Sequence, residues 1–161
     1  GVRAPLFAVL DAAIAPEVFL RIQECPEAKA SLLEGPKAEE MAAVAPYLVA
    51  LPAGSPALEP LVREGWGRSW GVFLTSDRPF EEVLARLRRL LEADSPHGGR
   101  VLFRFYDPRV LNLFLPSFEE DRRRAFFDSI SAWIAEAEGA LVEFALEGAA
   151  LSRKAHPLPQ S

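Results

Sequence analysis

The sequence Arg100-Val-Leu-Phe-Arg-Phe-Tyr-Asp-Pro-Arg-Val-Leu111 predicts a strand, a helix cap and a helix in direct succession. Side chains alternate over 101–106 with the period of two that is typical of a β-strand. Asp107 can accept hydrogen bonds as a helix cap, and Pro108 suits the first helical position. Arg104 needs a partner, because a charge within an apolar strand is costly unless it is paired. We therefore predict that Arg104 and Asp107 fix how the strand leads into the helix.

The chain has the composition of an ordinary soluble domain. Its 161 residues are 50% hydrophobic and 25% charged, which is enough to bury a core. The net charge of −5 opposes nucleic-acid binding, which depends on an excess of positive charge. The arginine clusters at 86–89 and 122–124 stand beside acidic residues, and we interpret them as solvated helix faces. No apolar run approaches the length that crosses a bilayer, so we expect no membrane partner.

Residues that bind metals or form disulfides are scarce. Cys25 is the only cysteine, which excludes an internal disulfide. The sequence has only two histidines, His97 and His156, so we expect neither a metal site nor a cofactor. Cys25 shares a predicted helix face with Val18 and Ile22, so we interpret it as a small core residue.

Strand patterns alternate with helical patterns along the chain. The strongest helix spans about 79–93, and the strand candidates are 6–10, 45–51, 69–75, 129–136 and 140–146. Glu138-Gly139 is a hairpin signal between the last two strands. This order predicts a single α/β domain over 1–151, with a mixed sheet, flanking helices and a C-terminal β-hairpin. The sequence from Ser152 onward is basic and contains prolines, so we expect 152–161 to be a loosely ordered tail.

The predicted helix after Asp107 carries more apolar surface than one buried face requires. Leu113 and Val110 lie apart from a first apolar side, which consists of Leu111, Phe114, Leu115 and Phe118. Two interpretations stay open, because the helix is either sandwiched in the core or offers an exposed patch to a partner.

Catalytic chemistry has little support in the residue pattern. The best constellation is Asp11, Arg104 and Asp107, all near predicted strand ends. An arginine between two carboxylates would keep their pKa values low, which is the wrong direction for a general acid. We therefore expect a protein that is not an enzyme. The alternatives are a small-ligand-binding or hydrolytic enzyme that uses Asp11 and Asp107, and an oligomerisation scaffold that uses a sheet edge of the last hairpin.

Several segments together resemble a known family. The segments are Leu6 to Asp11, Leu33-Glu-Gly35, Ala45-Pro-Tyr-Leu-Val49, Ser69-Trp-Gly-Val-Phe-Leu74 and Leu102-Phe-Arg-Phe-Tyr-Asp-Pro-Arg-Val-Leu111. They look like the effector chaperone or adaptor domain of bacterial type VI secretion, long catalogued as a domain of unknown function. The resemblance covers roughly residues 5 to 130. Its matched residues are interpreted first as fold determinants, namely Trp70, Gly71, Arg104, Asp107, Pro108 and Arg109.

The resemblance implies a binding module and not a catalyst. Members of the family bind a toxic effector and help to load it onto the VgrG-type spike protein at the tip of the secretion machine. A member would act in the cytoplasm of a Gram-negative bacterium, and the family pattern supplies no catalytic residues. Among the matched residues, Arg109 is the one that we expect to contact a partner. With the apolar helix, the predicted partner-binding set is Arg109, Leu111, Phe114, Leu115 and Phe118.

Overall fold

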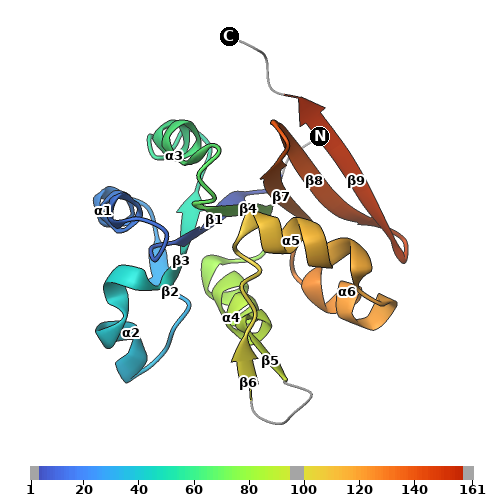
Figure 1. Ribbon diagram of the computed structural model, residues 1–161, viewed down its shortest axis with the longest axis horizontal. Coiled ribbons are helices and arrows are strands. Elements are labelled where there is room, and N and C mark those ends of the chain that lie inside the picture. Colours follow the sequence, from blue (N-terminus) through green and yellow to red (C-terminus); the bar gives the residue numbers. More distant parts are fainter. Residues whose placement is uncertain (1–3, 95–99, 158–161) are drawn as a thin grey trace.

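A seven-stranded sheet runs through the middle of the molecule (Figure 1). The computed structural model describes residues 4–94 and 100–157, with the backbone alone over 92–94 and 100–102. The strand order is β2-β3-β1-β4-β7-β8-β9. The strands are β1 (Leu6–Asp11), β2 (Lys29–Ser31), β3 (Pro46–Leu51), β4 (Gly71–Thr75), β7 (Ala132–Ala137), β8 (Ala140–Glu147) and β9 (Ala150–Pro157). The short strands β5 (Glu92–Asp94) and β6 (Arg100–Leu102) pair separately.

Helices cover both faces of the sheet (Figure 1). One face packs against α1 (Pro16–Glu24) and α3 (Leu58–Gly65). The other packs against α4 (Phe80–Leu91), α5 (Pro108–Phe114) and α6 (Glu120–Phe126). The remaining short helices are α2 (Pro36–Glu40), η1 (Ala42–Val44) and η2 (Leu115–Ser117). None of the described helices is long and apolar enough to span a membrane.

Strand β1 is apolar on both sides because it is buried on both sides. Phe7 and Val9 join the core beneath α4–α6, whereas Ala8 and Leu10 join the core beneath α1 and α3. This is why the strand is a continuous apolar run without alternation. The α/β class, the flanking helices and the C-terminal hairpin are confirmed by the structure.

The pairing within the sheet corrects the prediction of a mixed sheet. Every pairing between described strands is antiparallel. Helix α3 does connect two strands of the same direction, β3 and β4, as a crossover helix does. Strand β1 lies between them and runs opposite to both, so no two parallel strands become neighbours.

The strand predicted over 101–106 is shorter than expected. Strand β6 ends at Leu102, and Phe105 and Tyr106 form a turn before α5. The aromatic rings of Phe103 and Phe105 pack edge-on against Phe126, and Phe105 also meets Trp133. Core packing therefore replaces strand pairing as the reason for this apolar run. The sequence Ser95-Pro-His-Gly-Gly99, whose proline and glycines predict a turn, lies outside the described residues.

The C-terminal segment belongs to the sheet, which corrects the predicted loose tail as far as Pro157. Strand β9 pairs with β8 from Glu147–Ala150 to Ala140–Pro157. Gly148 has a φ of 65°, which suits the first position of a two-residue II′ turn between the strands. Basic and small residues on β9 concealed its strand character in the sequence, because little of that strand faces the core.

Candidate functional site

Of the predicted constellation of Asp11, Arg104 and Asp107, the structure joins Asp11 and Arg104 in an ion pair. Arg104 Nη2 lies 3.0 Å from Asp11 Oδ2, and Asp11 Oδ1 accepts a hydrogen bond from the backbone of Ala13. Asp11 is 1% exposed, so its carboxylate is satisfied inside the fold. Arg104 thus connects the end of β1 to the segment that precedes α5, although it lies outside a strand.

Asp107 pairs with Arg109 and not with Arg104, contrary to the predicted triad. Its carboxylate accepts hydrogen bonds from the backbone N–H of Arg109 at 2.9 Å and from Nη2 of the same residue at 2.7 Å. Burial raises the pKa of Asp107, but these hydrogen bonds from Arg109 outweigh it and hold the pKa below its usual value. Asp107 therefore caps α5 and, at the same time, fixes the guanidinium of Arg109.

The apolar helix predicted as a partner surface is divided by the structure. Leu111, Leu115 and Phe118 are buried in the core, so the core interpretation applies to these three residues. Phe114 is 42% exposed and packs at 6.0 Å, edge to face, on Phe103, while Leu113 is 68% exposed. A binding role for Arg109 and Phe114 stays a prediction, and Leu113 joins them on the surface.

An apolar groove lies on the sheet face that α3 covers. Its cavity holds about 270 Å³ between α3, strands β1 and β4, and the hairpin of β7 and β8. Glu136 is the only charged residue in its lining. Its walls include Leu58, Val62, Trp66, Trp70, Ile134 and Leu141. We call this cavity the α3–hairpin groove.

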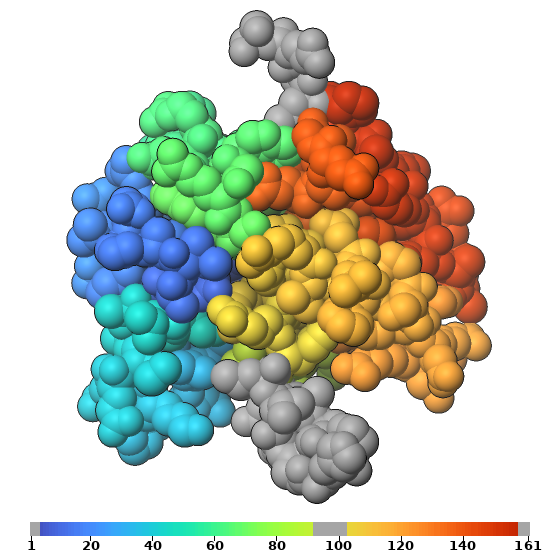
Figure 2. Space-filling model, viewed as in Figure 1, coloured from blue at the N-terminus to red at the C-terminus, as the bar shows by residue number. Residues whose placement is uncertain are grey.

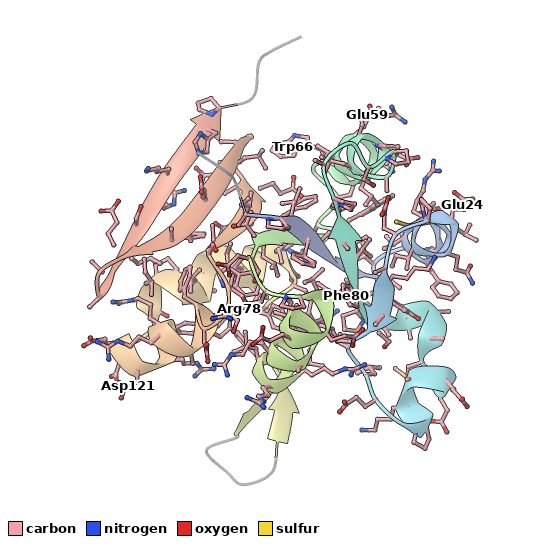
Figure 3. The ribbon with its side chains drawn as sticks, turned by 180° about the vertical axis from the view of Figure 1, so that it is seen from behind. Glu24, Glu59, Trp66, Arg78, Phe80 and Asp121 are labelled. Carbon is pink, nitrogen blue, oxygen red and sulfur yellow. The ribbon has the colours of Figure 1, made fainter. Side chains whose placement is uncertain are left out.

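A second hollow of about 410 Å³ adjoins the groove. Trp66 and Glu136 line both, and Figure 3 labels Trp66 beside α3, on the side facing the C-terminal strands. Pro108, Arg109 and Asn112 of α5 form another wall of the second hollow. Figure 2 shows the green segment around α3, the orange hairpin and the yellow α5 together on one face.

The groove and the hollow beside it bring together two motifs that lie far apart in the sequence. Trp70 and Gly71, interpreted as fold determinants, line the apolar groove. Pro108 and Arg109 line the adjoining hollow, where the side chain of Arg109 is 71% exposed. A cationic group therefore stands beside an apolar cavity, an arrangement suited to binding a protein segment.

Glu136 holds the loop that forms one end of the groove. Gly67 and Ser69 both have positive φ angles, and Ser69 is a residue that rarely adopts one. The carboxylate of Glu136 accepts hydrogen bonds from the backbone N–H groups of Gly67 at 2.6 Å and Ser69 at 3.3 Å. Strand β7 therefore stabilises the strained loop that presents Trp66.

The structure also tests what the sequence singled out for chemistry. Asp11 and Asp107 are both buried, and their oxygens bind arginine and backbone groups. In the described part of the chain, no group of three or more His, Cys, Asp and Glu side chains is placed to hold a metal ion. Cys25 is buried in the core beneath α1, in the place predicted for it.

The groove itself was not predicted from the sequence, although Trp66 and Trp70 both line it. A signal was present in β7 and β8, where Ile134 and Leu141 are apolar although Trp133 and Val142 already supply the core face. Apolar residues on both faces of a strand near the sheet edge indicate a second covered or binding surface.

The comparisons with known proteins identify the family. The profile of a family described as "Domain of unknown function (DUF4123)" matches residues 6–125, about three quarters of the chain. The chain belongs to this family, which is associated with type VI secretion. No curated protein and no solved structure matches the chain. Strands β7–β9 follow the matched segment and lie outside the match. In the structure they nevertheless belong to the same sheet as the matched strands.

Proposed function

We propose that this protein is a non-catalytic adaptor of type VI secretion, which binds a toxic effector and helps to load it onto a VgrG-type spike protein. Membership of the family over residues 6–125 is the observation that carries the proposal. The proposal places the protein in the cytoplasm of a Gram-negative bacterium, where effectors are loaded before secretion.

The α3–hairpin groove supports an adaptor role by its chemistry. Its lining is apolar around Trp66 and Trp70, and aromatic residues at the centre of an interface contribute much of the binding free energy. Arg109 adds a charged group at the rim, held in place by Asp107. We propose that an apolar segment of the effector fills the groove, with a polar or acidic group beside Arg109.

The family role predicts two protein partners, and both can be tested in one experiment. The chain is co-expressed with the toxin encoded beside it, and separately with the spike protein, and each is recovered through a tag on the chain. The proposal expects the toxin to co-purify in a stoichiometric complex. Absence of complexes with both the toxin and the spike protein, while the chain itself is folded, would contradict the adaptor role.

Two matched variants separate the groove from the rest of the surface. Trp66→Ala removes an aromatic wall shared by both hollows. Leu20→Ala removes an exposed apolar side chain from α1, outside the groove. We expect Trp66→Ala to reduce recovery of the toxin and Leu20→Ala to leave it unchanged.

A further inference from the structure

Strand β9 is the edge of the sheet and is long for an edge strand. It has eight residues, and no described strand pairs with its outer side. At about 3.3 Å per residue, its outer edge extends for about 26 Å. The opposite edge, β2, has three residues, and Lys29 there donates hydrogen bonds to the carbonyl oxygens of Gln23 and Cys25. The two edges therefore differ, because only β9 presents a long row of backbone groups.

The hairpin turn determines which backbone groups of β9 point outward. In a two-residue hairpin the pair that closes the turn is hydrogen-bonded, and bonded pairs recur at every second residue. Glu147–Ala150 closes this turn, so Ser152, Lys154 and His156 bond to β8. The N–H and C=O groups of Leu151, Arg153 and Ala155 consequently face away from the sheet.

The side chains of β9 give this edge a positive charge. Arg153, Lys154 and His156 are exposed, and no acidic residue occurs from Ala150 to Pro157. The chain as a whole has a net charge of −5, so β9 differs in sign from the molecule. In the part of the chain that the structure describes, neither Arg153 nor Lys154 forms an ion pair.

The neighbours of these charges are on strand β8. Glu143 stands opposite Lys154 in the register, and its carboxylate lies 3.3 Å from His156 Nε2. Glu143 therefore partly offsets the positive charge on that face of the edge. Arg153 stands opposite the buried Phe144 on the other face, where β8 supplies no carboxylate beside it. Both faces of the edge therefore keep positive charge available to an added strand.

We propose that the outer edge of β9 takes up an extended, acidic segment of a partner protein as an additional strand. Backbone groups of Leu151, Arg153 and Ala155 would supply the hydrogen bonds, and Arg153 and Lys154 would pair with carboxylates of the added strand. The addition of a partner strand to β9 goes beyond the proposed function, because it concerns the sheet edge and not the groove. It does not depend on a role in type VI secretion.

Charge argues against a second copy of this chain as the occupant. Two β9 strands that pair edge to edge bring only positive and neutral side chains together, whichever register they adopt. Like charges opposite one another destabilise strand pairing. Charged edge residues commonly prevent self-association, and here their shared sign also selects an acidic strand over a basic one.

Synthetic peptides test the proposal on the intact chain. One blocked peptide has the length of β9 and alternates glutamate with valine, and its matched control carries lysine in place of glutamate. We expect the acidic peptide alone to bind, and to protect the amides of Leu151, Arg153 and Ala155 from hydrogen exchange measured by NMR. Binding of both peptides alike, or binding without protection of these amides, would overturn the proposal.

Two variants keep the test decisive. Ala155→Pro removes an outward N–H that no strand uses, so β8 keeps its pairing, and Ala155→Val is the matched control that retains the N–H. The proline variant should weaken acidic-peptide binding at least about fivefold, and the valine variant should bind as the parent does. Equal binding by both variants, or a dimer of the parent chain in sedimentation at micromolar concentration, would count against the proposal.

Discussion

Arg104 joins the segment before α5 to the end of β1 through Asp11, with 3.0 Å between Nη2 and Oδ2. The two residues are 93 positions apart in the sequence, so the pair fixes two distant segments relative to one another. The carboxylate of Asp11 is buried, whereas the side chain of Arg104 is about half exposed. Loss of the arginine would leave a buried carboxylate with less compensation.

The first prediction concerns the strength of this pair. Asp11→Asn, Arg104→Gln and the double variant form a double-mutant cycle, read by urea unfolding. We expect a coupling free energy of about 1 kcal/mol, moderated by solvent screening at the exposed arginine. Additive effects of the two single substitutions would show that the pair contributes nothing to stability.

The second prediction concerns Gly71, where β4 and β1 approach closely. A Cβ at this position would lie 2.0 Å from the carbonyl oxygen of Val9, so Gly71→Ala must push the two strands apart. We expect a loss of about 3 kcal/mol in the free energy of unfolding. Gly65→Ala is the control, because its Cβ would lie 3.1 Å from Trp70, a tight contact but a much milder one than the 2.0 Å contact at Gly71.

These two glycine variants are compared by chemical denaturation, with sheet content followed by circular dichroism. A Gly71→Ala protein as stable as the Gly65→Ala protein would contradict the close approach of β1 and β4.

The third prediction concerns pH. The pKa of Asp107 is lower in the folded chain than in the unfolded one, so its stabilising contribution is present above the unfolded pKa, near pH 4. That contribution is lost as pH falls through the lower, folded pKa. Asp107→Ala should cost about 1 kcal/mol at pH 7 through loss of the helix cap, and the difference from the parent should shrink toward pH 2.

Urea unfolding of both proteins at pH 7, 4 and 2.5 measures this difference. Asp107→Asn is the control that keeps a capping oxygen and removes the charge. A parent-to-alanine difference that stays constant over this pH range would exclude an ionised Asp107 as its source.

The fourth prediction concerns the divided faces of α5. Phe114→Asp should leave the domain folded and weaken partner binding, because Phe114 is partly exposed at the surface. Leu111→Asp should unfold the domain, because Leu111 is buried in the core and an unpaired charge cannot be accommodated there. Circular dichroism and co-purification with the toxin distinguish the two. An unfolded Phe114→Asp protein would assign the whole helix to the core.

The class of fold could be predicted because its signals are local. The apolar run of β1, the cap at Asp107 and the hairpin at Glu138-Gly139 each depend on a few consecutive residues. The strand predicted around Arg104 was too long, since alternation of Phe103 and Phe105 reports burial and does not say whether strands or helices bury them. The tail was wrong for the opposite reason, since most of β9 is exposed.

The candidate site could be predicted only in part. Arg109 was expected at a surface for contact, and the structure places it in the wall of a hollow. The groove itself exists because β7 pairs with β4, which places Ile134 on the sheet face that α3 covers. Such a juxtaposition joins residues more than fifty positions apart, so the apolar second face of β7 and β8 can indicate a covered surface but does not specify which elements meet there.

The affinity of the purified neighbouring toxin for Trp66→Ala, measured by calorimetric titration, tests most directly whether the groove binds the effector. We predict that Trp66→Ala binds the toxin about thirtyfold more weakly than the parent, because the substitution removes an aromatic hot spot. Leu20→Ala should bind the toxin as the parent does. A folded Trp66→Ala protein with the affinity of the parent would contradict the account.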